Sequence, residues 1–236
     1  MSTKIIKVLW TGRLSYNSGL KLQKILSDRH HQKLKDENCN TLILIEHNPV
    51  FTVGIRDKIY TIEDEKRLKN LGAEFFRTNR GGLITFHGPG QLVAYPILNL
   101  KQFKNGIKWY VCQIENMIIR LCAKYGIKGE KSSDTGIWIN DKKICAIGIH
   151  GCRYITTHGL ALNCNTDLNW FNHIVPCGIE GKGVTSISQE LNTNVTIQDV
   201  LPLFQNVFQD QFECTLIEYS VEESSQLLKL VNNSIY

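Results

Sequence analysis

A cysteine in a Pro-Cys-Gly loop is the first candidate for chemistry in this chain of 236 residues. The thiolate form of cysteine attacks carbonyl carbons far better at neutral pH than a hydroxyl does. Most of the eight cysteines, including Cys145, lie in apolar runs, and we interpret them as small packing residues. Cys177 lies instead between Pro176 and Gly178, in a loop whose backbone N–H groups could support an oxyanion. We therefore consider Cys177 a candidate nucleophile.

A nucleophilic thiol needs a neighbouring group that takes its proton. Histidine is the usual base, and the candidates are His87, His158 and His173. A lysine serves only where burial or nearby positive charge lowers its pKa from about 10.4. Lys143 opens an apolar strand, a position from which a lysine usually extends its amine to solvent. Residue type and spacing alone do not choose among these four side chains.

A glycine-rich stretch from Arg80 to Pro96, RGGLITFHGPGQLVAYP, is the second feature that could bind a ligand. It contains four glycines, two prolines and one histidine between two apolar runs. Glycine permits positive φ and close approach of the backbone, so such a loop can surround a ligand with main-chain N–H groups. The alternative is a hairpin that only turns the chain.

The same stretch resembles the RGG-x-x-T-x-HGPGQ-x-x-x-YP signature of the lipoyl(octanoyl) transferases, also called lipoate–protein ligase B. Further family elements occur in order as EHNP with TVG, KICAIGI, THGLALN and PCG. The resemblance covers roughly residues 10–191. The segments LNCNTDLNWFNHIVPCG and GVTSISQEL are most similar to the animal mitochondrial members.

This resemblance implies a fold shared with lipoate and biotin protein ligases, and an acyl transfer in two steps. Octanoyl-acyl carrier protein gives its chain to a cysteine as a thioester, and a lysine of a lipoyl domain then takes the chain as an amide. This is the first step of endogenous protein lipoylation. The thioester is already activated, so the resemblance implies no cofactor, ATP or metal. It assigns the acyl-bearing cysteine to Cys177 and its partner in a Cys/Lys dyad to Lys143.

The resemblance also implies a substrate pocket and two kinds of protein partner. The pocket residues are Arg80, Gly81, Gly82, Leu83, Ile84, Thr85, Phe86, His87, Ala146, Ile147, Gly148, Gly159, Leu160 and Ala161. His87 could orient the substrate or hold the loop through a hydrogen bond, and we favour the second role. The donor is octanoyl-acyl carrier protein. The acceptors are lipoyl domains such as those of the glycine cleavage H protein and the 2-oxoacid dehydrogenase E2 subunits.

Two other functions remain as alternatives. An ATP-dependent lipoate or octanoate ligase of the same fold forms an acyl-adenylate and needs no nucleophilic cysteine. A non-catalytic protein that binds acyl carrier protein or lipoyl domains does not need both Cys177 and Lys143. Since the chain has both residues, we rank the transferase first, the ligase second and the binding protein third.

The composition narrows the class of protein. With 42% hydrophobic residues, the chain suits one large domain, or two at most, and we expect a single domain over residues 1–236. No apolar run approaches the ~18 residues that span a membrane. The formal charge of +5 is too modest and scattered to indicate nucleic acid binding, although it could steer acidic protein partners. Without a secretory signal or a C-x-x-C pair, the cysteines indicate reduced thiols rather than disulfides or structural zinc.

The amino end bears on the compartment. The first acidic residue is Asp28, and an acid-poor start is compatible with an organelle transit peptide. Residues 4–10 also have the pattern of a first strand, which we favour. From the likeness to animal members we expect the mitochondrial matrix, or the cytoplasm if the source is bacterial.

Hydrophobic periodicity predicts an α/β (α+β) fold with a mixed sheet flanked by helices. Residues 107–125 give the clearest helix, because their apolar positions recur every three or four residues. Thr61 with Asp64, and Thr196 with Asp199, have the spacing of capping boxes, although Pro202 could delay or kink the second helix. Other helices are expected in residues 15–35, 168–175 and 221–231.

The expected strands include two local pairs. Residues 136–139 and 143–149 should form a hairpin around Asn-Asp-Lys, and residues 83–86 should pair with 92–98 around the glycine loop. Strands and helices do not alternate strictly, which favours a mixed sheet. The remaining strands are expected at 4–10, 41–46, 50–54, 74–77, 153–164 and 214–219.

Overall fold

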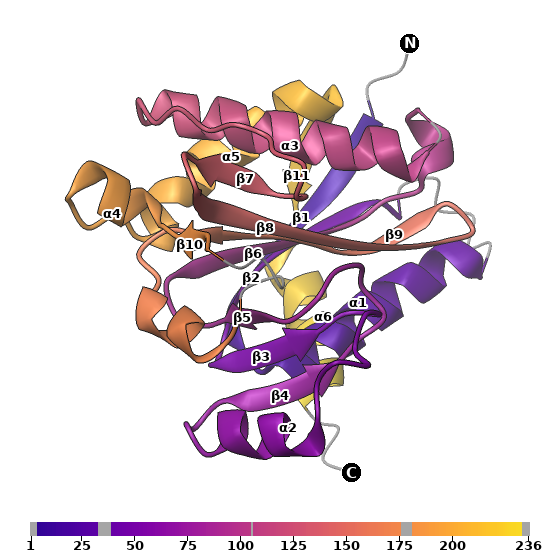
Figure 1. Ribbon diagram of the computed structural model, residues 1–236. Coiled ribbons are helices and arrows are strands. Elements are labelled where there is room, and N and C mark those ends of the chain that lie inside the picture. Colours follow the sequence, from indigo (N-terminus) through magenta and orange to yellow (C-terminus); the bar gives the residue numbers. More distant parts are fainter. Residues whose placement is uncertain (1–3, 33–38, 105, 176–180, 233–236) are drawn as a thin grey trace.

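A computed structural model of the chain describes residues 4–32, 39–104, 106–175 and 181–232. Its centre is an eight-stranded sheet (Figure 1). The strands run in the order β10 (Gly183–Val184), β8 (Lys142–Cys152), β9 (Ile155–Asn163), β6 (Gln91–Ile97), β2 (Thr41–His47), β1 (Lys4–Leu14) and β11 (Cys214–Glu218), with β7 (Ile137–Ile139) also paired to β8. β1 runs parallel to β2 and β11, whereas β2, β6, β9 and β8 are successively antiparallel. The expected mixed sheet is confirmed.

A second, three-stranded sheet lies beside one face of the first. Its order is β4 (Glu74–Arg77), β3 (Val50–Val53) and β5 (Thr85–His87). The expected pairing of residues 83–86 with 92–98 is therefore wrong, because β5 pairs with β3 and β6 pairs with β2 and β9. Between β5 and β6 the chain passes from one sheet to the other, with Gly90 at φ +78°. Residues 78–84, just before β5, form the glycine loop that lies against the large sheet, where the backbone N–H of Gly81 donates to the carbonyl of Ile149.

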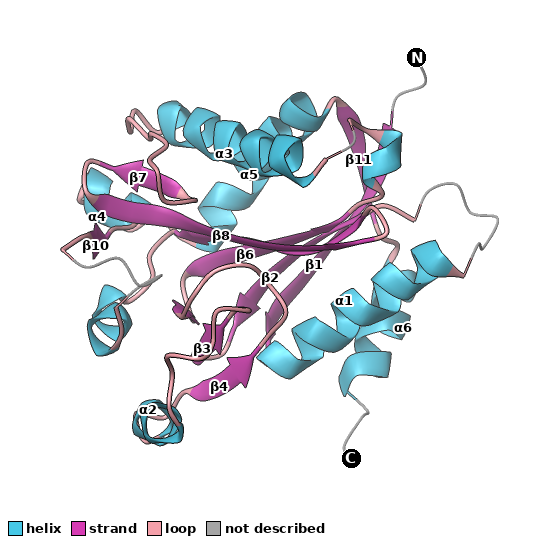
Figure 2. Ribbon diagram, turned by 45° about the vertical axis from the view of Figure 1, so that its right-hand side comes forward, coloured by secondary structure: helices cyan, strands magenta, loops and turns pink. Residues whose placement is uncertain are grey.

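Helices cover both faces of the large sheet (Figure 2). α3 (Ile107–Lys124) and α5 (Ile197–Phe212) pack on one face, where their apolar stripes join the core around Ile114 and Phe204. α1 (Tyr16–His31) and α6 (Val221–Asn232) cover the other face. α2 (Ile62–Lys69) packs beside β4, and α4 (Ile187–Leu191) and the 3₁₀ helices η1 (Leu100–Gln102) and η2 (Leu168–His173) are shorter. Among the described residues, no helix has the length and apolarity to cross a membrane.

The helix starts follow the sequence signals closely. Thr61 and Thr196 each accept a hydrogen bond from the backbone N–H three residues on, and Asp64 and Asp199 reciprocate. Pro202 does not delay α5, which begins at Ile197. The expected helix in residues 168–175 is the shorter 3₁₀ helix η2. The expected hairpin around residues 140–142 is confirmed as β7 and β8.

A β-bulge interrupts the pairing of β7 with β8. Ile137 pairs with Cys145, but the next residue, Trp138, pairs with Lys143, so β8 has one extra residue. Ile144 and Cys145 consequently both enter the core beneath α3. Lys143 then lies on the opposite face of the sheet, with Ala146. One strand thereby supplies both a hydrophobic core and the predicted catalytic lysine.

Candidate active site

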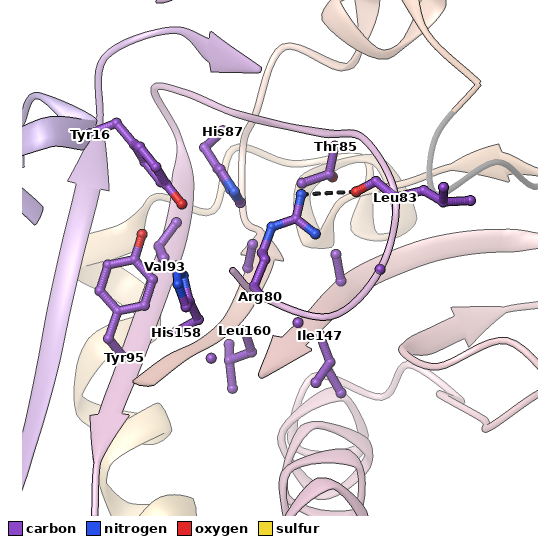
Figure 3. Close-up of a pocket in the computed structure, with 15 residues that line it drawn as sticks. Tyr16, Arg80, Leu83, Thr85, His87, Val93, Tyr95, Ile147, His158 and Leu160 are labelled. Atoms are coloured by element: carbon purple, nitrogen blue, oxygen red, sulfur yellow. Dashed lines mark hydrogen bonds between the residues drawn. The ribbon is translucent and has the colours of Figure 1, made fainter. Parts of the chain in front are cut away.

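A pocket lies between the glycine loop and the face of the large sheet (Figure 3). The pocket is lined by residues of helix α1, of strands β5, β6, β8 and β9, and of the loop that joins β4 to β5. The residues are Tyr16, Arg80, Gly82, Leu83, Thr85, His87, Val93, Tyr95, Ala146, Ile147, Gly148, His158, Gly159, Leu160 and Ala161. Eleven of the fourteen predicted substrate residues are among them.

The other three predicted residues lie elsewhere. Ile84 and Phe86 point into a separate small core with Phe51, so they support the loop from behind. Gly81 lines a neighbouring cavity that also includes Lys143. Alternation along β5 explains the division, because Thr85 and His87 face the pocket and Phe86 faces away.

Glycines allow the loop and the strands to approach each other this closely. A Cβ atom on Gly148 would lie 3.0 Å from the carbonyl oxygen of Gly81, and one on Gly159 would lie 2.0 Å from that of Ala94. The backbone N–H of Gly81 donates to the carbonyl of Ile149 at 3.0 Å. Gly82 has φ +95°, a conformation that favours glycine. Glycines from three of the sequence motifs therefore leave bare backbone along the pocket.

Arg80 holds the loop in place. Its side chain is buried and donates to the carbonyl of Thr52 at 2.6 Å, to the Thr52 hydroxyl at 2.9 Å and to the carbonyl of Leu83 at 2.9 Å. These hydrogen bonds join the loop to β3. They also fix one positive charge beside the pocket.

His87 is buried between two hydrogen-bond partners. Its Nδ1 lies 2.7 Å from Oε1 of Gln91, and its Nε2 lies 3.2 Å from Oγ1 of Thr52. Burial, together with the neighbouring His47 and Arg80, lowers the pKa of His87 to about 3. The ring is therefore uncharged at neutral pH, and both its nitrogens have partners. This supports the interpretation that His87 holds the loop.

The other histidine candidates differ in position. His158 lines the pocket, and burial followed by the charge of Arg80 lowers its pKa to about 3. Its Nε2 lies 2.8 Å from Oδ1 of Asn79, and its backbone N–H donates to Gln23 at 2.6 Å. His173 is exposed on η2 and does not line the pocket.

Lys143 is buried, contrary to the usual behaviour of a lysine at a strand end. It is 6% exposed, its Nζ donates to the carbonyl of Thr135 at 3.1 Å, and it lies 4.6 Å from the ring centroid of Trp138. Lys143 shares a small cavity with Thr85, Ala146 and Ala161, all of which also line the main pocket. Lys143 therefore lies in a small cavity that adjoins the main pocket.

Cys177 lies outside the described residues, but the residues on both sides of its segment are described. Phe171 of η2 and Val184 of β10 line the same small cavity as Lys143. Val184 pairs with Lys143 in the sheet, and Thr185 donates to the Lys143 carbonyl at 3.0 Å. By contrast, Cys145 is fully buried, and burial raises its pKa well above that of a free thiol. Cys145 is thus a packing residue, as expected.

Comparisons with known proteins assign this chain to one family. The model of the lipoyl protein ligase A/B catalytic domain matches residues 15–209. The chain belongs to this family. A mitochondrial octanoyl-[acyl-carrier-protein]:protein N-octanoyltransferase of Danio rerio is 57% identical over 214 residues, covering 89% of this chain and 94% of that protein. The Homo sapiens protein of the same name is 43% identical over 230 residues, covering 92% and 97%. A Bacteroides fragilis octanoyltransferase is 46% identical over 178 residues, covering 72% and 80%.

Solved structures of the family share the fold at low identity. A putative lipoate protein ligase from T. acidophilum superposes with a TM-score of 0.71 at 15% identity, covering 98% of this chain and 95% of that one. A lipoate-protein ligase A bound with ATP gives 0.69 at 15% identity, with the same coverage. At this identity the likeness establishes the fold alone. It confirms the expected lipoate-ligase-like architecture.

Sequence reasoning missed three pocket residues, Tyr16, Val93 and Tyr95. Tyr95 lies within the family signature as its YP tyrosine, so it could have been included. Val93 occupies a variable position of the same signature on an apolar strand, where nothing in the sequence distinguishes it from a core residue. Tyr16 carried no signal, because its position depends on how α1 packs over the sheet. Among the described residues, no group of three His, Cys, Asp or Glu side chains could hold a metal ion.

Proposed function

We propose that this chain transfers the octanoyl group of octanoyl-acyl carrier protein, through a thioester on Cys177, to the target lysine of lipoyl domains. The observation that carries the proposal is the buried Lys143, whose small cavity adjoins a pocket lined mainly by glycines and by apolar and aromatic side chains. The segments on both sides of the Pro-Cys-Gly loop line the cavity of that lysine. The names of relatives at 43–57% identity agree with this reaction.

In the first step Cys177 takes the acyl chain. The proton of the Cys177 thiol passes to Lys143, and the thiolate sulfur, now beside the lysine ammonium, attacks the carbonyl carbon of the donor thioester. As the tetrahedral intermediate collapses, the C–S bond to the donor breaks, and Lys143 returns its proton to the departing thiolate. The products are the acyl-enzyme thioester and the free thiol of the carrier protein.

In the second step the acceptor takes the chain. The neutral amine of the lipoyl-domain lysine attacks the thioester carbon and forms a C–N bond. Lys143 accepts the proton that the amine loses and gives it to the sulfur of Cys177 as the C–S bond breaks. An amide replaces a thioester, so the step is downhill and regenerates the starting enzyme.

Intact-protein mass spectrometry after mixing with octanoyl-acyl carrier protein tests the proposal directly. The wild-type chain should gain the mass of one octanoyl group and lose it when a lipoyl domain is added. Cys177→Ala should gain none, whereas Cys145→Ala should keep most of the acylation because its thiol lies in the core. Acylation of Cys177→Ala together with loss in Cys145→Ala would reverse the assignment.

The shared fold does not exclude the ATP-dependent ligase, because a solved relative of this fold is a ligase bound with ATP. The two reactions differ in their donor. We expect no octanoylation of a lipoyl domain from free octanoate, ATP and magnesium, and full octanoylation from octanoyl-acyl carrier protein. Modification from free octanoate would establish the ligase instead.

We place the reaction in the mitochondrial matrix, because the Danio rerio and Homo sapiens relatives are named mitochondrial. Lipoyl domains of the glycine cleavage H protein and the 2-oxoacid dehydrogenase E2 subunits are the acceptors in this proposal. Were the source bacterial, as in the Bacteroides fragilis relative, the compartment would be the cytoplasm.

A further inference from the structure

The pocket has two ends of different character. Thr85, Ala146 and Ala161 join it to the cavity of Lys143. Tyr16 and Tyr95 line the pocket but not that cavity. Figure 3 shows the two tyrosines together on one side of Arg80, with their hydroxyl groups turned toward each other, and Thr85 on the other side. A chain attached near Lys143 would therefore point its far end at the tyrosines.

The sheet sets the distance between these ends. Ala146 of β8 pairs with Ala161 of β9, which pairs with Val93 of β6. Adjacent strands lie ~4.8 Å apart, so the floor from β8 to β6 spans roughly 10 Å. An extended chain of eight carbons has about this length. Tyr95 stands two residues after Val93 on the same strand and face, and Tyr16 of α1 lies opposite it.

Tyr16 is held rigidly where it stands. It is the first residue of α1, directly after Ser15, whose hydroxyl caps the helix by accepting from the backbone of Ser18 at 3.1 Å. The ring is 1% exposed and lies parallel to His87 at 5.9 Å between centroids. Its centroid also lies 5.1 Å from that of His47, in an edge-to-face arrangement, and 5.2 Å from that of Phe76. A ring enclosed in this way cannot move aside without disturbing its neighbours.

We propose that Tyr16 is the end wall of the acyl pocket and sets the longest chain that the enzyme accepts. This inference rests on the proposed octanoyl transfer. A chain longer than the floor must displace the Tyr16 ring or leave its extra methylenes outside. Replacing the ring by a methyl group would open space toward His47 and Phe76, which now contact it. Each methylene that this space accepts should improve use of the donor about fourfold.

The test is a competition between two donors in one tube. Equimolar octanoyl- and decanoyl-acyl carrier protein are mixed with the enzyme, and the ratio of the two acyl-enzymes is read by intact-protein mass spectrometry at early times. Because both donors meet the same enzyme, the ratio does not depend on the folded fraction. Tyr16→Ala should raise the decanoyl-to-octanoyl ratio at least tenfold. Tyr16→Phe, which keeps the ring, should leave the ratio within twofold of wild type.

A matched control removes a different buried tyrosine. Tyr110 of α3 is fully buried beneath the opposite face of the sheet, and it does not line the pocket. Tyr110→Ala should therefore leave the ratio unchanged. Tyr16→Leu, which keeps more packing, serves if the alanine variant does not fold, and it should raise the ratio severalfold.

Two results would overturn the inference in distinguishable ways. A wild-type ratio in folded Tyr16→Ala or Tyr16→Leu would show that another group limits chain length. If the wild-type enzyme takes no acyl group from either donor, the proposed octanoyl transfer is wrong, and so is the role of Tyr16 as the end wall.

Discussion

Three buried histidines next to the pocket are kept uncharged. Burial is the main cause that lowers the pKa of His47 to about 4, and of His87 and His158 to about 3. Nε2 of His47 lies 2.8 Å from the Tyr95 hydroxyl. A group with so low a pKa is a weak base at neutral pH. This favours Lys143 over His87 and His158 as the proton acceptor for the thiol.

The same histidines should make the fold sensitive to acid. In the unfolded chain each binds a proton near pH 6.5, whereas in the folded protein each does so only near pH 3 to 4. Stability is therefore complete above pH 6.5 and is lost as the pH falls below it. At pH 5 each histidine should cost about 2 kcal/mol of unfolding free energy. Urea unfolding between pH 7 and pH 5 measures this loss.

Two variants separate this effect from general acid sensitivity. His47→Gln removes one of the three buried histidines. Below pH 6 the unfolding free energy of this variant should therefore fall with a slope that is smaller than that of the wild type by about 1.4 kcal/mol per pH unit. His173→Gln changes an exposed histidine and should follow the wild-type curve. Identical curves for wild type and His47→Gln would contradict the assignment.

Lys143 should control the reactivity of Cys177. An ordinary thiol has a pKa near 8.5, and a nearby ammonium group favours the thiolate. Lys143→Met removes the charge at similar bulk, so alkylation of Cys177 by iodoacetamide should slow at pH 7 and recover towards pH 8.5. Peptide mass spectrometry follows the labelling, and superimposable curves would exclude this role.

A neighbouring lysine provides the control for that measurement. Lys142 precedes Lys143 on β8 but is exposed. Lys142→Met should therefore leave the labelling curve of Cys177 as in the wild type. In Lys143→Met, transfer to the lipoyl domain should fall further than labelling, because the proton acceptor is lost as well as the charge.

Among the secondary-structure elements, the helices and their caps were predicted better than the partners of the strands. The 3.6-residue period of residues 107–125 and the Thr-Asp spacings identify α3, α2 and α5, because helices and caps depend on neighbours in sequence. The pairing of residues 83–86 with 92–98 failed because strand partners are chosen by distant packing. Phe86 belongs to a core with Phe51 and Phe171, and this draws β5 to β3.

The site shows the same division. Composition and spacing left four bases open, and only the family signature selected Lys143. The bulge that turns Lys143 to the pocket depends on the register of β7 against β8, which no local pattern contains. The sequence did not predict Tyr16 as a pocket residue for a similar reason. Its place in the pocket depends on how α1 packs against the sheet.

The tight packing of strands β9 and β6 at Gly159 gives a prediction about stability. A Cβ on Gly159 would lie 2.0 Å from the carbonyl oxygen of Ala94, so Gly159→Ala must push β9 and β6 apart. We expect a loss of about 3 kcal/mol or more in unfolding free energy, measured by urea titration. Gly81→Ala is the matched control, because its Cβ would meet only the Ile149 oxygen at an ordinary 3.5 Å. Equal stability of the two variants would contradict the packing described here.

For the whole molecule, the fold by itself does not select the reaction. A ligase bound with ATP shares this architecture at 15% identity. What differs is local, since the thioester route needs a thiol and a proton acceptor placed at the end of the acyl pocket. The layers of helix and sheet hold β8, which carries Lys143, and β6, which carries Tyr95, at a fixed separation.

The pocket walls also belong to the two main cores of the molecule. Leu160 packs in the core beneath α3 and α5, whereas Val93 and Tyr95 pack in the core beneath α1 and α6. An octanoyl chain on Cys177 would thus pack between the two cores as an additional apolar group. Formation of the acyl-enzyme would therefore stabilise the folded state. Six buried methylenes could add up to about 5 kcal/mol. The acyl-enzyme should melt several degrees higher than the free enzyme, and Cys177→Ala mixed with the donor should show no such rise. The resistance of the enzyme to unfolding would then depend on the concentration of its octanoyl donor.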